Sequence, residues 1–221
     1  MPALKRPPAT FSRTEQETYR SPPSFGNLPM LSLEFPGARQ LIAAIDAAVV
    51  LPDETATTDA LRHALCKLIR NPDVQLPSCV FEREDDHYAR RELYLSEEHG
   101  YSVVAMTWGP GQGTPIHDHA GQWCVEGVWQ GFLEITPYEL VESKDGQYRF
   151  EPRGTMNAGA GSAGSLIPPH EYHTILNPSE DANAVSLHIY RRVLENCSKF
   201  YPTGSGWYRC QECQLALDST Q

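Results

Sequence analysis

Two histidines lie two residues apart in the segment Gly111–His119, which reads Gly-Gln-Gly-Thr-Pro-Ile-His-Asp-His. Successive side chains of a β-strand point to opposite faces, so His117 and His119 share one face if the segment is extended, and Asp118 takes the other. Imidazole is a common metal ligand, and two neighbouring imidazoles supply half of a typical site. The pair therefore predicts a metal centre whose third ligand comes from a later strand.

The later part of the chain offers three candidates for that third ligand, namely His170, His173 and His188. His170 follows the Pro168-Pro169 turn, where a rim or solvent-facing position is the alternative to ligation. The remaining histidines lie in a predicted helix or near turns, and we interpret them as structural: His63, His87 and His99.

One predicted strand carries three polar side chains in alternation. Ser186, His188 and Tyr190 occupy positions i, i+2 and i+4 and share a face, while the residues between them face the core: Val185, Leu187 and Ile189. Buried polar groups need hydrogen-bond partners, so we expect a relay that orients the Tyr190 hydroxyl. The alternative is the polar outer face of an edge strand.

These residues follow two predicted helices and lie among many short strands. Apolar residues at helical spacing predict a helix over about 37–50 and a second one that ends at Asn71-Pro72. Strand-like runs follow, separated by turn residues such as Lys144-Asp-Gly-Gln: 101–108, 122–128, 131–138, 147–152, 164–168, 172–177 and 185–190. This order predicts helices followed by an antiparallel sandwich or barrel. Residues 1–30 lack periodicity and are expected to form an extended or partly disordered lead.

Composition limits the partners of the protein. The 18 basic and 28 acidic residues give a net charge of −10, which argues against nucleic acid. No apolar run reaches the roughly 18 residues of a membrane span, and no signal peptide is evident, so we expect a cytoplasmic protein without a membrane partner. The six cysteines are then expected to be reduced. Cys210 and Cys213 form a lone CxxC pair, either incidental or a surface redox pair. The oligomeric state is left open, and a monomer fits the sequence.

The histidine motifs resemble the cupin superfamily. Its first signature is G-x5-H-x-H-x3,4-E-x6-G, and Gly111, the His pair and Gly131 match it. The second ends in H-x3-N, which His173 and Asn177 match. The resemblance implies a mainly β fold, a jelly-roll-like barrel over about 80–200 that follows helices over about 35–72, in a single domain over 31–221. Position 124 departs from the signature, because Cys124 stands where most cupins have a glutamate ligand.

That departure is typical of cysteine dioxygenase and its thiol dioxygenase relatives, which this chain resembles over about 85–200. The resemblance implies that His117, His119 and His173 hold Fe(II) and that both atoms of O2 are added to the sulfur of L-cysteine, giving cysteine sulfinate. Dioxygenases for 3-mercaptopropionate or mercaptosuccinate, and a non-catalytic cupin that binds a small ligand, are the alternatives. A neutral three-histidine set suits a thiolate substrate, because no carboxylate ligand at position 124 opposes its charge.

The resemblance also assigns groups around the metal. Tyr88-Ala-Arg90 matches the arginine-type branch, in which the guanidinium binds the substrate carboxylate. The neighbouring Arg91 is the alternative. Tyr190, His188, Ser186 and Cys124 are the implied catalytic residues, and some relatives join the cysteine and the tyrosine by a thioether bond. Trp108 and Cys197 fall on family positions that we interpret as packing.

Overall fold

The computed structural model describes residues 34–220, so the lead predicted over residues 1–30 lies outside the described part of the chain. Three helices come first: α1 (Ala38–Val49), α2 (Glu54–Leu68) and the short 3-10 helix η1 (Ser78–Phe81). Twelve strands follow: β1 (Ala89–Leu95), β2 (Ser102–Trp108), β3 (Ile116–His117), β4 (Cys124–Gln130), β5 (Phe132–Lys144), β6 (Gln147–Pro152), β7 (Met156–Gly159), β8 (Ala163–Leu166), β9 (His173–Leu176), β10 (Ala184–Tyr190), β11 (Asn196–Gly204) and β12 (Trp207–Gln214). The predicted order of helices and then strands is confirmed.

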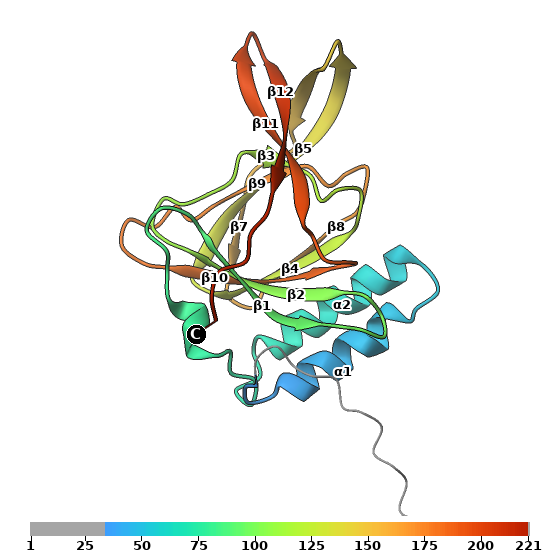
Figure 1. The fold of residues 1–221 in the computed structure, drawn as a ribbon, viewed down its shortest axis with the longest axis vertical. Coiled ribbons are helices and arrows are strands. Elements are labelled where there is room, and N and C mark those ends of the chain that lie inside the picture. The colour runs from blue at the N-terminus through green and yellow to red at the C-terminus, as the bar shows by residue number, and fades with distance from the viewer. Residues whose placement is uncertain (1–33, 221) are drawn as a thin grey trace, which may run out of the picture.

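The strands form two antiparallel sheets that face each other as a barrel (Figure 1). One sheet has the order β1-β2-β10-β4-β8, and the other has the order β6-β12-β11-β3-β9-β5-β7. The outer ends of the β5–β6 and β11–β12 hairpins project from the top of the barrel in Figure 1, whereas the helices lie below it. The mainly β architecture with helices at its start agrees with the predicted fold class.

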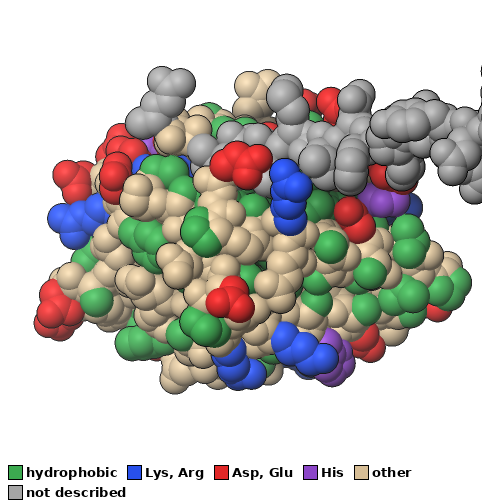
Figure 2. All heavy atoms as spheres, turned by 90° about the horizontal axis from the view of Figure 1, so that it is seen from below, with side chains coloured by type: hydrophobic (Ala, Val, Ile, Leu, Met, Phe, Trp, Pro, Cys, Tyr) green, Lys and Arg blue, Asp and Glu red, His purple; other side chains and the backbone are tan. Residues whose placement is uncertain are grey.

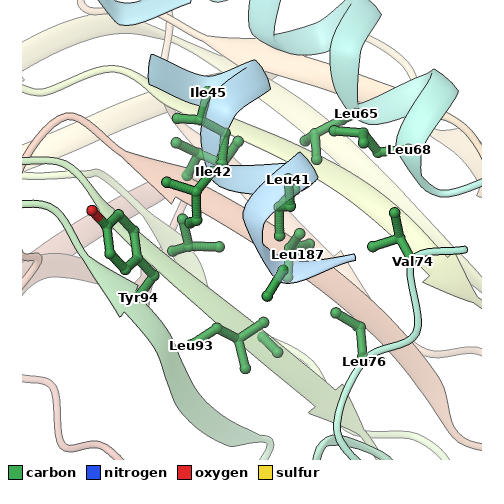
Figure 3. Close-up of a cluster of buried hydrophobic side chains, with 14 of the residues drawn as sticks. Leu41, Ile42, Ile45, Leu65, Leu68, Val74, Leu76, Leu93, Tyr94 and Leu187 are labelled. Atoms are coloured by element: carbon green, nitrogen blue, oxygen red, sulfur yellow. The ribbon is translucent and has the colours of Figure 1, made fainter. Parts of the chain in front are cut away.

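The two helices cover the outer face of the five-stranded sheet. Leu41, Ile42 and Ile45 of α1 point into a cluster that also holds Leu65 of α2 and Leu187 of β10 (Figure 3). The helix α2 begins at an ordinary N-cap, because the Asp53 side chain accepts a hydrogen bond from the Ala56 amide at 2.8 Å. Burying each large aliphatic side chain typically contributes about 1.5–3 kcal/mol, so this contact fixes the helices on the sheet.

The opposite face of the same sheet lines the barrel interior. Every residue of β2 and β10 is buried, because the helices pack on one face and the second sheet closes the other. Val185, Leu187 and Ile189 therefore join the helix-side cluster, while Tyr190 belongs to the interior cluster. Since β10 lies between β2 and β4, the edge-strand interpretation of Ser186, His188 and Tyr190 is wrong.

Several strands were not predicted from the sequence. The charged start of β1 and the polar, half-exposed β11 and β12 lack clear alternation, and the last two extend the strands to residue 214 rather than about 200. The predicted turn between β5 and β6 is confirmed, with positive φ at both Asp145 (51°) and Gly146 (73°), the backbone of a two-residue hairpin.

Two observations bear on partners. Among the described residues, no helix is long and apolar enough to cross a membrane. Figure 2 views the molecule from below Figure 1, and on the part of this face that is visible the basic and acidic side chains are interspersed rather than gathered into a basic patch.

Candidate metal centre and substrate pocket

The sheet with seven strands brings the three predicted histidine ligands together. His117 on β3 pairs directly with His173 on β9, and the two ring centroids are 4.4 Å apart. His119 follows two residues later on the same face, 5.1 Å from the His173 ring. One ligand nitrogen from each histidine lies within 4.8 Å of the others, as a shared metal ion requires. The sequence prediction of this triad agrees with the geometry.

Backbone carbonyls orient two of the three rings. The Nδ1 atom of His117 lies 3.2 Å from the Pro115 carbonyl, and the Nδ1 atom of His173 lies 3.0 Å from the Glu171 carbonyl. A carbonyl only accepts, so each Nδ1 carries the proton and each Nε2 is left to bind a metal.

Burial and the neighbouring histidines lower the pKa of His117 and of His119, which keeps both rings neutral as metal binding demands. The buried Nε2 atom of His173 has no hydrogen-bond partner among the described residues. The donor set therefore fits a metal ion.

Glu171 lies beside His119, the remaining histidine of the triad, and was not predicted. Its Oε2 accepts a hydrogen bond from the His119 amide at 2.8 Å and lies 3.5 Å from the His119 Nδ1 atom. Burial raises the pKa of Glu171 to about 7, and the hydrogen bond from the His119 amide opposes part of that shift. The His119 Nδ1 atom has no hydrogen-bond partner among the described residues, so Glu171 positions this ligand through its backbone amide.

We expect Glu171→Gln to lower metal affinity by about 10- to 100-fold, because such partners of ligands typically contribute that much. Competition with a chelator at constant pH measures this affinity. The matched control is Glu134→Gln, since Glu134 lies on β5 between two inward-facing residues and projects from the other face of the strand. Equal affinity in wild type and Glu171→Gln would show that the backbone alone positions His119.

A narrow cavity opens at the triad. It is lined by the three histidines together with Tyr88, Arg90, Met106, Trp108, Thr114, Ile175, His188, Tyr190, Leu194, Cys197 and Leu215. Tyr88 stacks on Trp108 with centroids 4.4 Å apart. Arg90 lines the cavity, whereas Arg91 is buried elsewhere and donates to the Ser219 and Glu82 carbonyls. Adjacent residues of a strand point in opposite directions, so only Arg90 faces the metal centre.

The end of the described chain holds Arg90 in place. The Ala216 carbonyl accepts a hydrogen bond from an Arg90 Nη1 donor at 3.0 Å, and Asp218 Oδ2 accepts from the Arg90 amide at 2.7 Å. His87 Nε2 lies 2.9 Å from the other Asp218 oxygen, and these carboxyl contacts raise the pKa of His87. A guanidinium has five N–H donors, so donors remain for a bound carboxylate.

The first half of the relay predicted on β10, the hydrogen bond between Ser186 and His188, is present. Trp108 donates to Ser186 at 2.8 Å, and Ser186 is hydrogen-bonded to His188 Nε2 at 2.8 Å. The second nitrogen of His188 lies 3.4 Å from Glu126, so it faces this carboxyl group. The rings of His188 and Tyr190 are stacked with centroids 6.0 Å apart. The predicted bond from His188 to Tyr190 is therefore wrong, and Trp108 has a role beyond packing.

Glu126 was missed by sequence reasoning. It follows Cys124 by two residues on β4 and faces the barrel interior directly opposite His188. Its Oε2 lies 3.8 Å from the His173 Nε2 atom. Burial raises the pKa of Glu126, and His173 partly opposes the shift. Residues two apart in a strand share a face, so Glu126 points the same way as Cys124. This alternation was the sequence signal that could have identified Glu126.

Cys124 and Tyr190 are also direct neighbours across β4 and β10. Both side chains are buried, and burial raises the pKa of the thiol and of the phenol, so both remain protonated. Directly opposed residues of antiparallel strands have Cβ atoms about 4.5–5.5 Å apart, which suits a bond between their side chains.

The other candidates lie away from the metal centre. His170 is exposed and does not join the metal-binding group, so the alternative third ligand is wrong. His63 is exposed on α2, whereas His87 and His99 lie near turns as expected. Cys210 and Cys213 lie three residues apart on β12, which places their thiols on opposite faces and argues against a redox pair.

Comparison with known proteins agrees with this geometry. Residues 80–202 match the family model described as cysteine dioxygenase type I. The chain belongs to this family. It is 28% identical to cysteine dioxygenase type 1 of Danio rerio over 120 residues, which cover 54% of this chain and 59% of the relative. The human protein of the same name is 25% identical over 129 residues, covering 55% and 60% of the two chains. The match therefore spans about three fifths of each relative.

One solved structure that is similar to this chain is a Cupin 2 conserved barrel domain protein from Salinispora arenicola. It has a TM-score of 0.37 and 15% identity, and the alignment covers 55% of this chain and 89% of that one. Within the matched region, His117, His119 and His173 are the residues that could hold a metal ion.

Proposed function

We propose that the protein is an iron-dependent thiol dioxygenase that converts L-cysteine to cysteine sulfinate. The observation that carries the proposal is the cluster of His117, His119 and His173 in the wall of a cavity that Arg90 also lines. Iron bound by the triad would supply a soft, redox-active site for the thiol and for O2. A cytoplasmic location remains a prediction.

The reaction balances without another reductant. The sulfur of the thiol is oxidised by four electrons, O2 is fully reduced, both oxygen atoms become bonded to sulfur, and the thiol proton is released. The residues of this chain orient the reactants: Arg90 binds the carboxylate, the apolar wall of Leu194 and Leu215 limits water, and Tyr190 presents a protonated hydroxyl.

Oxygen uptake by the iron-loaded protein tests the proposal, with sulfinate measured by mass spectrometry. L-cysteine, 3-mercaptopropionate, mercaptosuccinate and cysteamine form the panel. Efficient oxidation of cysteine supports the proposal, and preference for another thiol acid would identify the alternative dioxygenase. Iron binding without turnover of any thiol would favour a ligand-binding cupin.

Arg90→Ala is expected to lower kcat/KM for cysteine by about 10- to 150-fold, because a charge-assisted hydrogen bond is worth roughly 1.5–3 kcal/mol. Most of the loss should appear in KM, since the carboxylate is bound equally before and during reaction. Cysteamine lacks the carboxylate and should be a poor substrate that the substitution hardly affects. Equal oxidation of cysteine by the variant and wild type would place the carboxylate elsewhere.

Turnover with cysteine is expected to produce a Cys124–Tyr190 thioether in part of the protein. The support is the direct pairing of these two buried residues beside the metal site. Forming the bond is a two-electron oxidation in which the thiol and the phenol ring each lose one hydrogen and O2 is the oxidant, so intact-mass measurement and peptide mapping detect the loss of two hydrogens. Cys124→Ser provides the control without a thiol. Only unmodified Cys124 after prolonged turnover would contradict the expectation.

A further inference from the structure

The segment 215–219 follows β12 and contacts β1 beside the substrate cavity (Figure 1, dark red). We propose that Asp218 in this segment is a positioning residue for substrate binding: it holds the backbone of Arg90 and thereby fixes how the guanidinium enters the cavity. The proposal rests on the proposed function, in which Arg90 binds the carboxylate of the thiol substrate. Asp218 is separated from Arg90 by 128 positions and lies beyond residues 80–202, which match the family model.

The backbone of Arg90 is held at the edge of a sheet. β1 pairs with β2 and forms one edge of the five-stranded sheet, and an edge strand has N–H and C=O groups that no neighbouring strand uses. Asp218 binds both of these groups of Arg90. Its Oδ2 accepts a hydrogen bond from the Arg90 amide at 2.7 Å, and its own amide donates to the Arg90 carbonyl at 2.7 Å. One residue therefore fixes the main chain from which the guanidinium projects.

The Asp218 carboxylate has a second contact, with the loop before β1. Its Oδ1 lies 2.9 Å from His87 Nε2. Burial alone would raise the pKa of Asp218, but the hydrogen bonds from the Arg90 amide and from His87 outweigh burial and lower the pKa, so the carboxylate is ionised at neutral pH. An ionised acceptor forms stronger hydrogen bonds than a neutral one. The carboxylate thus joins segment 215–219 to two points around the start of β1.

The same segment contacts the side chain of Arg90. The Ala216 carbonyl accepts a hydrogen bond from Arg90 Nη1 at 3.0 Å. Leu215 lines the cavity and packs partly against the interior cluster, whereas Leu217 is 48% exposed. Polar contacts therefore carry much of the attachment of this segment. If the segment moved away from β1, the guanidinium would lose a fixed partner and the backbone of Arg90 would lose both of its contacts at the edge.

The alternative is a purely structural role for Asp218. Loss of such a contact would lower the melting temperature and leave substrate selectivity unchanged. A positioning role has a different consequence, because only substrates with a carboxylate use Arg90. Cysteine and cysteamine share a thiol and an amine and differ in this carboxylate, so the ratio of their affinities separates the two roles.

The experiment compares iron-loaded wild type, Asp218→Ala, Arg90→Ala and the double variant. Anaerobic titration calorimetry measures the Kd of L-cysteine and of cysteamine, and oxygen uptake measures kcat and KM. We expect Asp218→Ala to weaken cysteine binding about 2- to 10-fold, the effect of one ordinary hydrogen bond, and to leave cysteamine binding unchanged. The double variant should bind cysteine no more weakly than Arg90→Ala, because Asp218 acts through Arg90. Asp218→Asn keeps the shape and one acceptor and should retain part of the affinity.

Asp46→Ala is the matched control. Asp46 lies on α1 and accepts a hydrogen bond from the Tyr101 hydroxyl at 2.8 Å, within the helix side of the molecule. This variant should lose thermal stability and keep the ratio of the two affinities. Hydrogen exchange of the Arg90 amide, measured by mass spectrometry on a peptide that contains it, should be faster in Asp218→Ala and unchanged in Asp46→Ala.

Equal losses of affinity for cysteine and cysteamine would overturn the proposal, and so would additive losses in the double variant. Unchanged exchange of the Arg90 amide in Asp218→Ala would also contradict it. The exchange measurement requires no turnover, so it separates this proposal from the proposed function. Wild type that oxidises no thiol refutes the function, whereas the exchange of the Arg90 amide still decides whether Asp218 holds Arg90.

Discussion

Alanine in place of His173 is expected to abolish thiol-dependent oxygen uptake and to leave the protein with little iron. The ring is fully buried, its Nδ1 is fixed by the Glu171 carbonyl, and its Nε2 is directed at the other two ligands. Loss of a group that only orients a ligand typically lowers affinity 10- to 100-fold, so loss of the ligand itself should exceed about 100-fold. Elemental analysis after chelator challenge measures the iron.

His170→Ala is the matched control, because His170 is exposed and lies three residues from His173 on the same connection. This variant should keep its iron and its activity. Full iron in His173→Ala together with loss in His170→Ala would mean that the third ligand is wrong. His117→Ala and His119→Ala should behave like His173→Ala, since all three nitrogens belong to one group.

The triad could be predicted because strand alternation is a local property. His117 and His119 share a face whatever the remainder of the chain does, and the spacing to His173 followed from the family resemblance. The sequence pointed to Arg90 but could not exclude Arg91, since both are arginines in one strand, and the structure puts Arg90 in the wall of the cavity. Only the direction of β1 against its neighbours decides which of them enters the cavity.

Glu126 and Glu171 could not be predicted with the same ease. Both depend on contacts between segments that are distant in the sequence: Glu126 faces His188 across two strands, and Glu171 reaches the His119 amide from the loop before β9. A charged residue in a strand is usually solvated, so its type alone argues against burial. The direction of His188 toward Glu126 likewise required the register of β4 and β10.

Prediction of the secondary structure from the sequence has the same limit. Helices with an apolar stripe were predicted closely, as α1 over 38–49 against an expected 37–50 illustrates. The strands β11 and β12 were not predicted, because much of their length is half-buried or exposed on both faces and shows no binary pattern. The pairing of β11 with β3 nevertheless supports the metal site, since Lys199 lies opposite His117.

Tyr190→Phe is expected to lower kcat by about 10²- to 10⁴-fold while iron content and KM change little. The phenol lines the cavity, and its ring centroid lies 6.0 Å from that of His119. Burial raises its pKa, so the hydroxyl stays protonated and remains a donor at neutral pH. A hydroxyl beside the reacting sulfur can donate to the oxygen atom that becomes bonded to it, as negative charge develops there. Loss of such a positioned donor typically has an effect of this size.

Tyr101→Phe controls for the removal of a buried tyrosine hydroxyl. Tyr101 is equally buried but belongs to the helix-side cluster, and its hydroxyl donates to Asp46 at 2.8 Å. This variant should lose some thermal stability and keep its turnover, whereas Tyr190→Phe should lose turnover whether or not its melting temperature changes. If Tyr190→Phe turns over like wild type, the hydroxyl takes no part in the reaction. Because His188 faces Glu126, the position of Tyr190 would then reflect only its pairing with Cys124.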